Sequence, residues 1–125
     1  FATALEVANS REGDCTEHAV LLAALCRAEK IPARVAFGLV YVEGEQAFAF
    51  HMWNEVWIQD RWIPLDATLA LGGIGAGHLL MGTSPLGDMS ALLDLRPVMQ
   101  AIGKLEIQAI PGDGQEIRKE SAGTM

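Results

Sequence analysis

Three residues of the types that cooperate in nucleophilic catalysis follow one another along the chain: Cys15, His51 and Asp66. A thiolate is a strong nucleophile, an imidazole exchanges a proton near neutral pH, and a carboxylate orients the imidazole. Such a base typically contributes ~10²–10⁴ in rate. Most free cysteines are small buried hydrophobes instead. The case for chemistry therefore depends on where the elements of the fold place these three side chains.

Cys15 is predicted to be the first residue of a helix that runs to about Lys30. Asp14 is the expected N-cap, and Glu17 completes the pattern of a capping box. Unpaired backbone N–H groups and the helix dipole favour a thiolate at that first position. Residues 19–26 are apolar on every side, which predicts a helix wrapped by other elements in the middle of its domain. Cys26, inside this run, fits a buried hydrophobe.

His51 and Asp66 are predicted to lie on consecutive strands. Residues 47–58 form the first strand, residues 62–65 form the second, and Asp66 follows directly. A two-residue loop at 59–60 would place Asp66 diagonal to His51 on the same face of the sheet, within side-chain reach. A loop of odd length would place them on opposite faces. The spacing therefore permits the contact without requiring it.

The rest of the chain predicts a mixed α and β domain over residues 1–110, followed by a polar, mobile tail over 111–125. The other expected elements are the end of a helix at Phe1–Val7, strands at Arg34–Glu43, Leu79–Met81 and Lys104–Ile110, a glycine-rich loop at Gly72–Gly77, and a helix at Asp88–Ile102 that Pro97 kinks or splits.

Composition excludes several classes of function. The chain has 125 residues, of which 50% are hydrophobic, and a formal net charge of −7. This charge disfavours nucleic acid and anionic lipid as partners. The apolar run at 19–26 is too short to span a membrane, so we expect a soluble domain, of unknown location. Both thiols are expected to be free, because Cys15 and Cys26 lie about three helical turns apart.

Four motifs in order resemble the transglutaminase-like superfamily, in particular its bacterial-type core. They are Gly13–Ala19 (GDCTEHA), Ile31–Arg34 (IPAR), His51–Val56 (HMWNEV) and Trp62–Thr68 (WIPLDAT). Lys30 stands where the family pattern has glycine. The resemblance implies a papain-like α+β fold, in which a central buried helix carries the nucleophile and packs on an antiparallel sheet. It also implies roles: Cys15 as nucleophile, His51 as general base and acid, and Asp66 as the residue that orients His51.

The activity that the resemblance implies is cysteine-dependent acyl transfer through a thioester, with no cofactor. The substrate would be a protein or peptide that offers a glutaminyl or peptide amide, and hydrolysis by a protease or amidase is favoured over cross-linking. His18, one turn from Cys15, and Trp53, on the face of His51, are the candidate substrate-binding residues. One alternative is a catalytically silent binding module. Another is a zinc site built from Cys15, His18, His51 and Asp66.

Two departures from the family pattern stand out. Only fourteen residues precede Cys15, and they hold no strong candidate for a second oxyanion donor beside the backbone N–H of Cys15. Because the chain starts at Phe1 rather than Met, it is compatible with a core truncated at its N-terminus and with being part of a larger chain. The sequence also lacks an EF-hand-like calcium loop and paired Cys-x-x-Cys zinc motifs.

Overall fold

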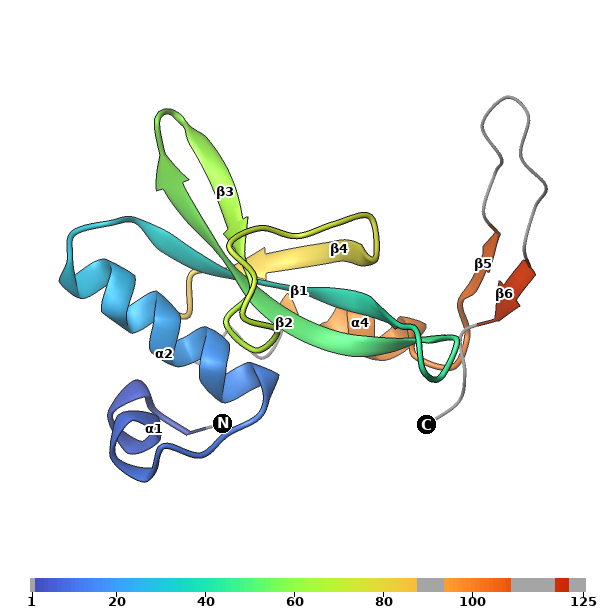
Figure 1. The fold of residues 1–125 in the computed structure, drawn as a ribbon, viewed down its shortest axis with the longest axis horizontal. Coiled ribbons are helices and arrows are strands. Elements are labelled where there is room, and N and C mark those ends of the chain that lie inside the picture. The colour runs from blue at the N-terminus through green and yellow to red at the C-terminus, as the bar shows by residue number, and fades with distance from the viewer. Residues whose placement is uncertain (1, 88–93, 109–118, 122–125) are drawn as a thin grey trace.

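The computed structural model describes residues 2–87, 94–108 and 119–121. Two helices precede a four-stranded sheet, and short elements follow it (Figure 1). In chain order the elements are α1 (Ala4–Ser10), α2 (Cys15–Ala28), β1 (Ala33–Val42), β2 (Ala47–Ile58), β3 (Arg61–Leu65), β4 (His78–Ser84), α4 (Arg96–Ala101), β5 (Glu106–Gln108) and β6 (Lys119–Ser121).

The main sheet is antiparallel throughout and has the strand order β3-β2-β1-β4. β2 and β3 form a hairpin in which Ile58 pairs with Arg61, so the loop is the two residues Gln59 and Asp60. This loop length confirms the register on which the expected contact between His51 and Asp66 depends. β5 and β6 form a separate two-stranded sheet.

The hairpin turn offers a test of local strain. Gln59 and Asp60 both adopt left-handed backbone angles, with φ of 51° and 59°, and such turns favour Asn-Gly. We expect the double change Gln59→Asn and Asp60→Gly to raise the free energy of unfolding by about 1 kcal/mol. Urea unfolding measures it, with Asp60→Ala as a control that keeps the strained angle. No gain in the double variant would show that the turn is not strained.

The core lies on the sheet face that α2 covers. Ala19 and Ala23 of α2 are fully buried against this face, and Val98 of α4 belongs to the same cluster. The strand residues of the cluster are Ala33, Val35, Phe37, Leu39, Met52 and Val56. Asn54 ties the helix to the sheet, because its Nδ2 donates to the backbone oxygen of Ala19 at 2.8 Å. By strand alternation His51 and Trp53 then face the other side.

The N-terminal helices differ from expectation. α1 has its own N-cap, Thr3, with a complete capping box, so this helix begins at Ala4. α2 begins at Cys15 with Asp14 as N-cap and Glu17 in the capping box, as predicted. It is not wrapped on all sides, because Leu25 is 56% exposed. The apolar run at 19–26 therefore has one face in the core and one exposed face.

The C-terminal part also differs from expectation. α4 begins at Arg96 and places Pro97 in its first turn, where proline needs no backbone N–H, so Pro97 helps to start this helix. The expected helical residues 88–93 lie outside the described residues, as do 109–110 of the expected last strand. β4 is longer than predicted. Lys119–Ser121, expected to be part of a mobile tail, pair with β5 as strand β6.

Both cysteines are free, as predicted. Within the described ranges, none of the helices combines the length and apolar character needed to cross a membrane.

Candidate catalytic site around Asp66

Asp66 is the centre of a buried polar cluster. Its Oδ2 accepts a hydrogen bond from His51 Nε2 at 2.7 Å and a second from His78 Nε2 at 2.9 Å. Its Oδ1 accepts one from the backbone N–H of Leu69 at 3.0 Å. The Asp66 side chain is fully buried, and those of His51 and His78 are only 7% and 5% exposed. The carboxylate thus has a donor on each oxygen and two imidazoles on one of them.

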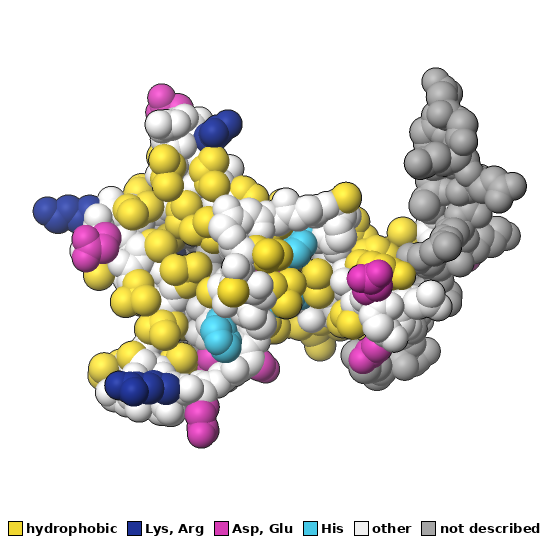
Figure 2. All heavy atoms as spheres, in the orientation of Figure 1, with side chains coloured by type: hydrophobic (Ala, Val, Ile, Leu, Met, Phe, Trp, Pro, Cys, Tyr) yellow, Lys and Arg dark blue, Asp and Glu magenta, His cyan; other side chains and the backbone are white. Residues whose placement is uncertain are grey.

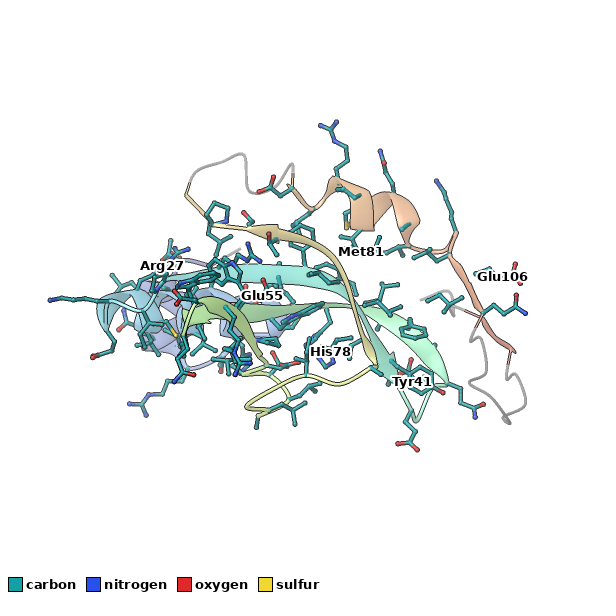
Figure 3. The ribbon with its side chains drawn as sticks, turned by 90° about the horizontal axis from the view of Figure 1, so that it is seen from above. Arg27, Tyr41, Glu55, His78, Met81 and Glu106 are labelled. Carbon is teal, nitrogen blue, oxygen red and sulfur yellow. The ribbon has the colours of Figure 1, made fainter. Side chains whose placement is uncertain are left out.

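Three segments of the chain position this cluster. The β2–β3 hairpin carries His51 and delivers Asp66 just past the end of β3. Asp66 exchanges backbone hydrogen bonds with Leu71, so the chain turns back immediately after the carboxylate. The loop then leads to His78, the first residue of β4, which pairs with Val40 of β1. Figure 3 shows His78 on the side of the sheet where this loop runs, opposite α4.

The pKa of Asp66 is lowered although the residue is buried. Burial by itself would raise the pKa of this carboxyl, but hydrogen bonds from His78, from the backbone of Leu69 and from His51 outweigh it. Asp66 is therefore ionised at neutral pH. An ionised carboxylate only accepts hydrogen bonds, so each imidazole must present Nε2–H to it.

This lowered pKa predicts a pH-dependent contribution of Asp66 to stability. Because the folded-state pKa lies below the unfolded one, the contribution is complete above the usual aspartate range and is lost as the pH falls through the folded value. We expect Asp66→Asn to reduce the free energy of unfolding by roughly 1–3 kcal/mol at neutral pH. The difference from the wild type should shrink toward pH 3. Urea unfolding across this range checks it, and a difference independent of pH would contradict it.

Cys15 reaches the edge of the sheet beside the cluster. The pairing of β3 with β2 ends at Asn54, so Met52 of β2 has no pairing partner on β3. The backbone N–H of Met52, the residue next to His51, forms a hydrogen bond to the half-buried Cys15 sulfur. Within the described part of the chain no hydrogen bond joins Cys15 to His51. The structure therefore brings His51 and Asp66 into contact and places the thiol at the adjacent residue.

The pKa of the Cys15 thiol differs from expectation. The sequence predicted a thiolate because Cys15 is the first residue of a helix. Burial raises the pKa of the Cys15 thiol above its ordinary value and the charge of Asp14 adds to this, while the Met52 N–H only partly opposes it. Cys15 does open the helix, but it also packs against the core. At neutral pH it is a thiol that needs a proton acceptor.

The two candidate substrate-binding residues have different environments. Trp53 is 1% exposed; its ring stacks on His51, with centroids 6.1 Å apart, and meets His78 edge-on at 5.2 Å. Its indole N–H is buried and has no partner among the described residues. His18 is exposed, and its Nδ1 donates to the backbone oxygen of Asp14 at 2.6 Å. A hollow of about 190 Å³ between the first two helices is lined by Val7, Ala8, Arg11, Glu12, His18 and Leu21.

Glu55 lies on β2 and, by strand alternation, on the same face as His51. Its side chain is only 12% exposed, and it forms an ion pair with Arg34 at 2.7 Å. The Arg34 guanidinium in turn lies 4.0 Å from the centre of the Trp62 ring. Glu55 is thus committed to a partner away from the cluster.

Among the described residues, the group that could hold a metal ion is not the set of zinc ligands that the sequence suggested. His51, Asp66 and His78 form a group whose ligand atoms all lie within 4.8 Å of one another. Cys15 and His18 are not members of this group. Two imidazoles and one carboxylate are suitable zinc ligands, but here both Nε2 atoms already donate to Asp66. These hydrogen bonds satisfy the carboxylate without a metal.

The model of the transglutaminase-like superfamily matches residues 2–67, just over half of the chain. The chain belongs to the transglutaminase-like superfamily. Members of this superfamily are generally cysteine-dependent enzymes with papain-like folds, and the helices and antiparallel sheet described here are compatible with its core. The searches of curated proteins and of solved structures gave no match.

The segment that matches the transglutaminase-like superfamily contains Cys15, His51 and Asp66, but it ends before His78. The sequence pattern does not connect His78 with Asp66, because a glycine-rich loop lies between the two residues. The one sequence feature that pointed to His78 is its position directly before the apolar residues of the next strand. This position indicates that His78 begins a strand, but it does not indicate that the strand lies beside Asp66.

Proposed function

We propose that this protein is a cysteine-dependent amide acyl-transfer enzyme that acts through a thioester, with Cys15 as nucleophile, His51 as general base and acid, and Asp66 as the residue that orients His51. The observation that carries the proposal is the buried hydrogen bond of 2.7 Å between His51 Nε2 and Asp66 Oδ2. Because Nε2 carries the proton shared with Asp66, Nδ1 of neutral His51 has the free lone pair that a base needs.

The reaction begins with transfer of the Cys15 Sγ proton to His51 Nδ1. The sulfur then attacks the carboxamide carbon, and the carbonyl oxygen becomes an oxyanion that the backbone N–H of Cys15 can stabilise. The C–N bond breaks, and His51 returns the proton to the leaving ammonia or amine. Water or an amine attacks the resulting thioester and gives its proton to His51. The C–S bond then breaks, the acid or amide product leaves, and His51 returns the proton to the sulfur. The thiol is thereby regenerated.

We favour hydrolysis over cross-linking. Water is the default acceptor for an accessible thioester, and a protein-amine acceptor would need a dedicated site. The favoured substrates are peptides and proteins that offer glutaminyl or peptide amides.

The test is a screen of glutaminyl and peptide amides with the wild type, Cys15→Ala and Cys26→Ala. We expect release of ammonia or amine with the wild type and Cys26→Ala, and none with Cys15→Ala. Mass spectrometry of the quenched reaction should find the acyl group on Cys15. Equal activity in Cys15→Ala and the wild type would refute the assignment of the nucleophile.

A catalytically silent binding module is the second candidate. The observation that favours it is the raised pKa of the Cys15 thiol, which follows from burial. A silent module predicts that Cys15 and Cys26 react with iodoacetamide equally and slowly, since burial also raises the pKa of Cys26. The enzyme predicts a much faster reaction of Cys15.

A further inference from the structure

His78 makes a contact that the proposed function does not use. Its Nε2 donates at 2.9 Å to Asp66 Oδ2, the same oxygen that accepts from His51. A carboxylate that only had to orient His51 would need one imidazole there. The second imidazole is buried as deeply as the first, and among the hydrogen bonds that lower the pKa of Asp66 its own is the largest.

The His78 ring is fixed from several directions. Its backbone N–H donates to Gly75 at 3.1 Å, and the carbonyl of Gly77 accepts from Tyr41 of β1 at 2.9 Å. The ring meets Trp53 edge-on, with an interplanar angle of 85°, and lies 5.8 Å from the His51 ring. Trp53 is thus packed against both histidines. A donor held this firmly limits how the Asp66 carboxylate can turn.

The three donors on Asp66 have a consequence for His51. With Leu69 on Oδ1 and His78 on Oδ2, rotation of the carboxylate would break two hydrogen bonds to a buried charge, and such bonds are worth more than neutral ones. The plane of the carboxylate therefore stays fixed. The direction from which Oδ2 accepts the His51 proton is fixed with it, and so is the Nε2–H tautomer of His51.

We propose that His78 is a positioning residue: by holding the Asp66 carboxylate it keeps His51 in the orientation and the Nε2–H tautomer that leave Nδ1 free to accept a proton. This inference rests on the proposed function, because the free Nδ1 is the atom that would serve Cys15. It adds a residue outside the segment that matches the superfamily.

The first experiment needs no substitution. Nitrogen-15 NMR of the imidazole rings identifies which nitrogen of each histidine carries the proton, and the chain has three histidines. We expect both His51 and His78 to be protonated at Nε2 near neutral pH. Protonation of neutral His78 at Nδ1 alone would overturn the proposal, because its Nε2 could then not donate to Asp66.

Two variants then separate the hydrogen bond from the ring. His78→Gln keeps an N–H donor at a similar reach, whereas His78→Leu keeps a similar volume without a donor. In His78→Leu we expect mixed tautomers of His51 and alkylation of Cys15 slowed about tenfold or more, as the loss of a hydrogen bond to a buried charge implies. In His78→Gln both readouts should stay near those of the wild type.

The outcomes distinguish this proposal from the proposed function. If Cys15 and Cys26 of the wild type react equally slowly, the enzyme assignment fails, while the NMR still tests how His51 is held. If His51 keeps one tautomer and an unchanged N–H signal in His78→Leu, the positioning role is wrong. Should His78→Leu not fold, loss of the tautomer in His78→Gln refutes it. One equivalent of zinc that shifts the signals of His51 and His78 would also refute it.

Discussion

Replacing His51 by alanine is expected to slow the alkylation of Cys15 by iodoacetamide by ~10²–10⁴ at neutral pH, the usual contribution of a positioned base. The physical reason is the environment of the sulfur. Burial and the charge of Asp14 raise the pKa of the Cys15 thiol, so without an acceptor for its proton Cys15 remains a thiol. If His51 accepts that proton on Nδ1, as we propose, it becomes an imidazolium whose charge the hydrogen-bonded Asp66 carboxylate would stabilise.

Cys26 is the internal reference for this measurement. It lies on the same helix as Cys15, and burial raises the pKa of its thiol too. Mass spectrometry after timed alkylation gives both rates from one sample. We expect the rate of Cys26 to be the same in the wild type and in His51→Ala. Equal rates for Cys15 in the two proteins would remove His51 from the mechanism.

The sequence permitted the contact between His51 and Asp66, conditional on a two-residue loop, because the contact depends on local features. The alternation along residues 47–58 fixes the face of His51, and the two-residue turn at 59–60 carries that register to Asp66. Both features lie within one hairpin. The capping box that starts α2 at Cys15 is equally local. Each of these predictions needed only a few neighbouring residues.

The parts of the site that the sequence did not predict depend on long-range packing. β4 pairs with β1 through a register shift at Phe37/Gly38, where the backbone oxygen of Leu79 occupies the space that a Cβ on Gly38 would need. The close approach that brings in β4 and His78 therefore requires glycine at position 38, far along the chain from His78. The raised pKa of Cys15 likewise follows from burial, a tertiary effect that outweighs the helix start.

The change Asp66→Asn should cause the largest loss of activity for the smallest change in shape, about 10⁴ in kcat by analogy with triads whose carboxylate is replaced. Oδ1 of Asp66 accepts the Leu69 N–H, so the asparagine should keep its amide oxygen there and place its NH₂ group toward the two imidazoles. An amide NH₂ can only donate. Neutral His51 must then carry its proton on Nδ1, where it cannot accept one from Cys15.

The control for this change is Glu55→Gln, on the same strand as His51. It removes the charge that pairs with Arg34 and leaves the contacts of Asp66 in place, so activity should stay close to that of the wild type. Imidazole NMR of Asp66→Asn should find His51 protonated at Nδ1, and circular dichroism should find the fold retained. A folded Asp66→Asn variant with full activity would show that Asp66 serves stability alone and that His51 needs no carboxylate.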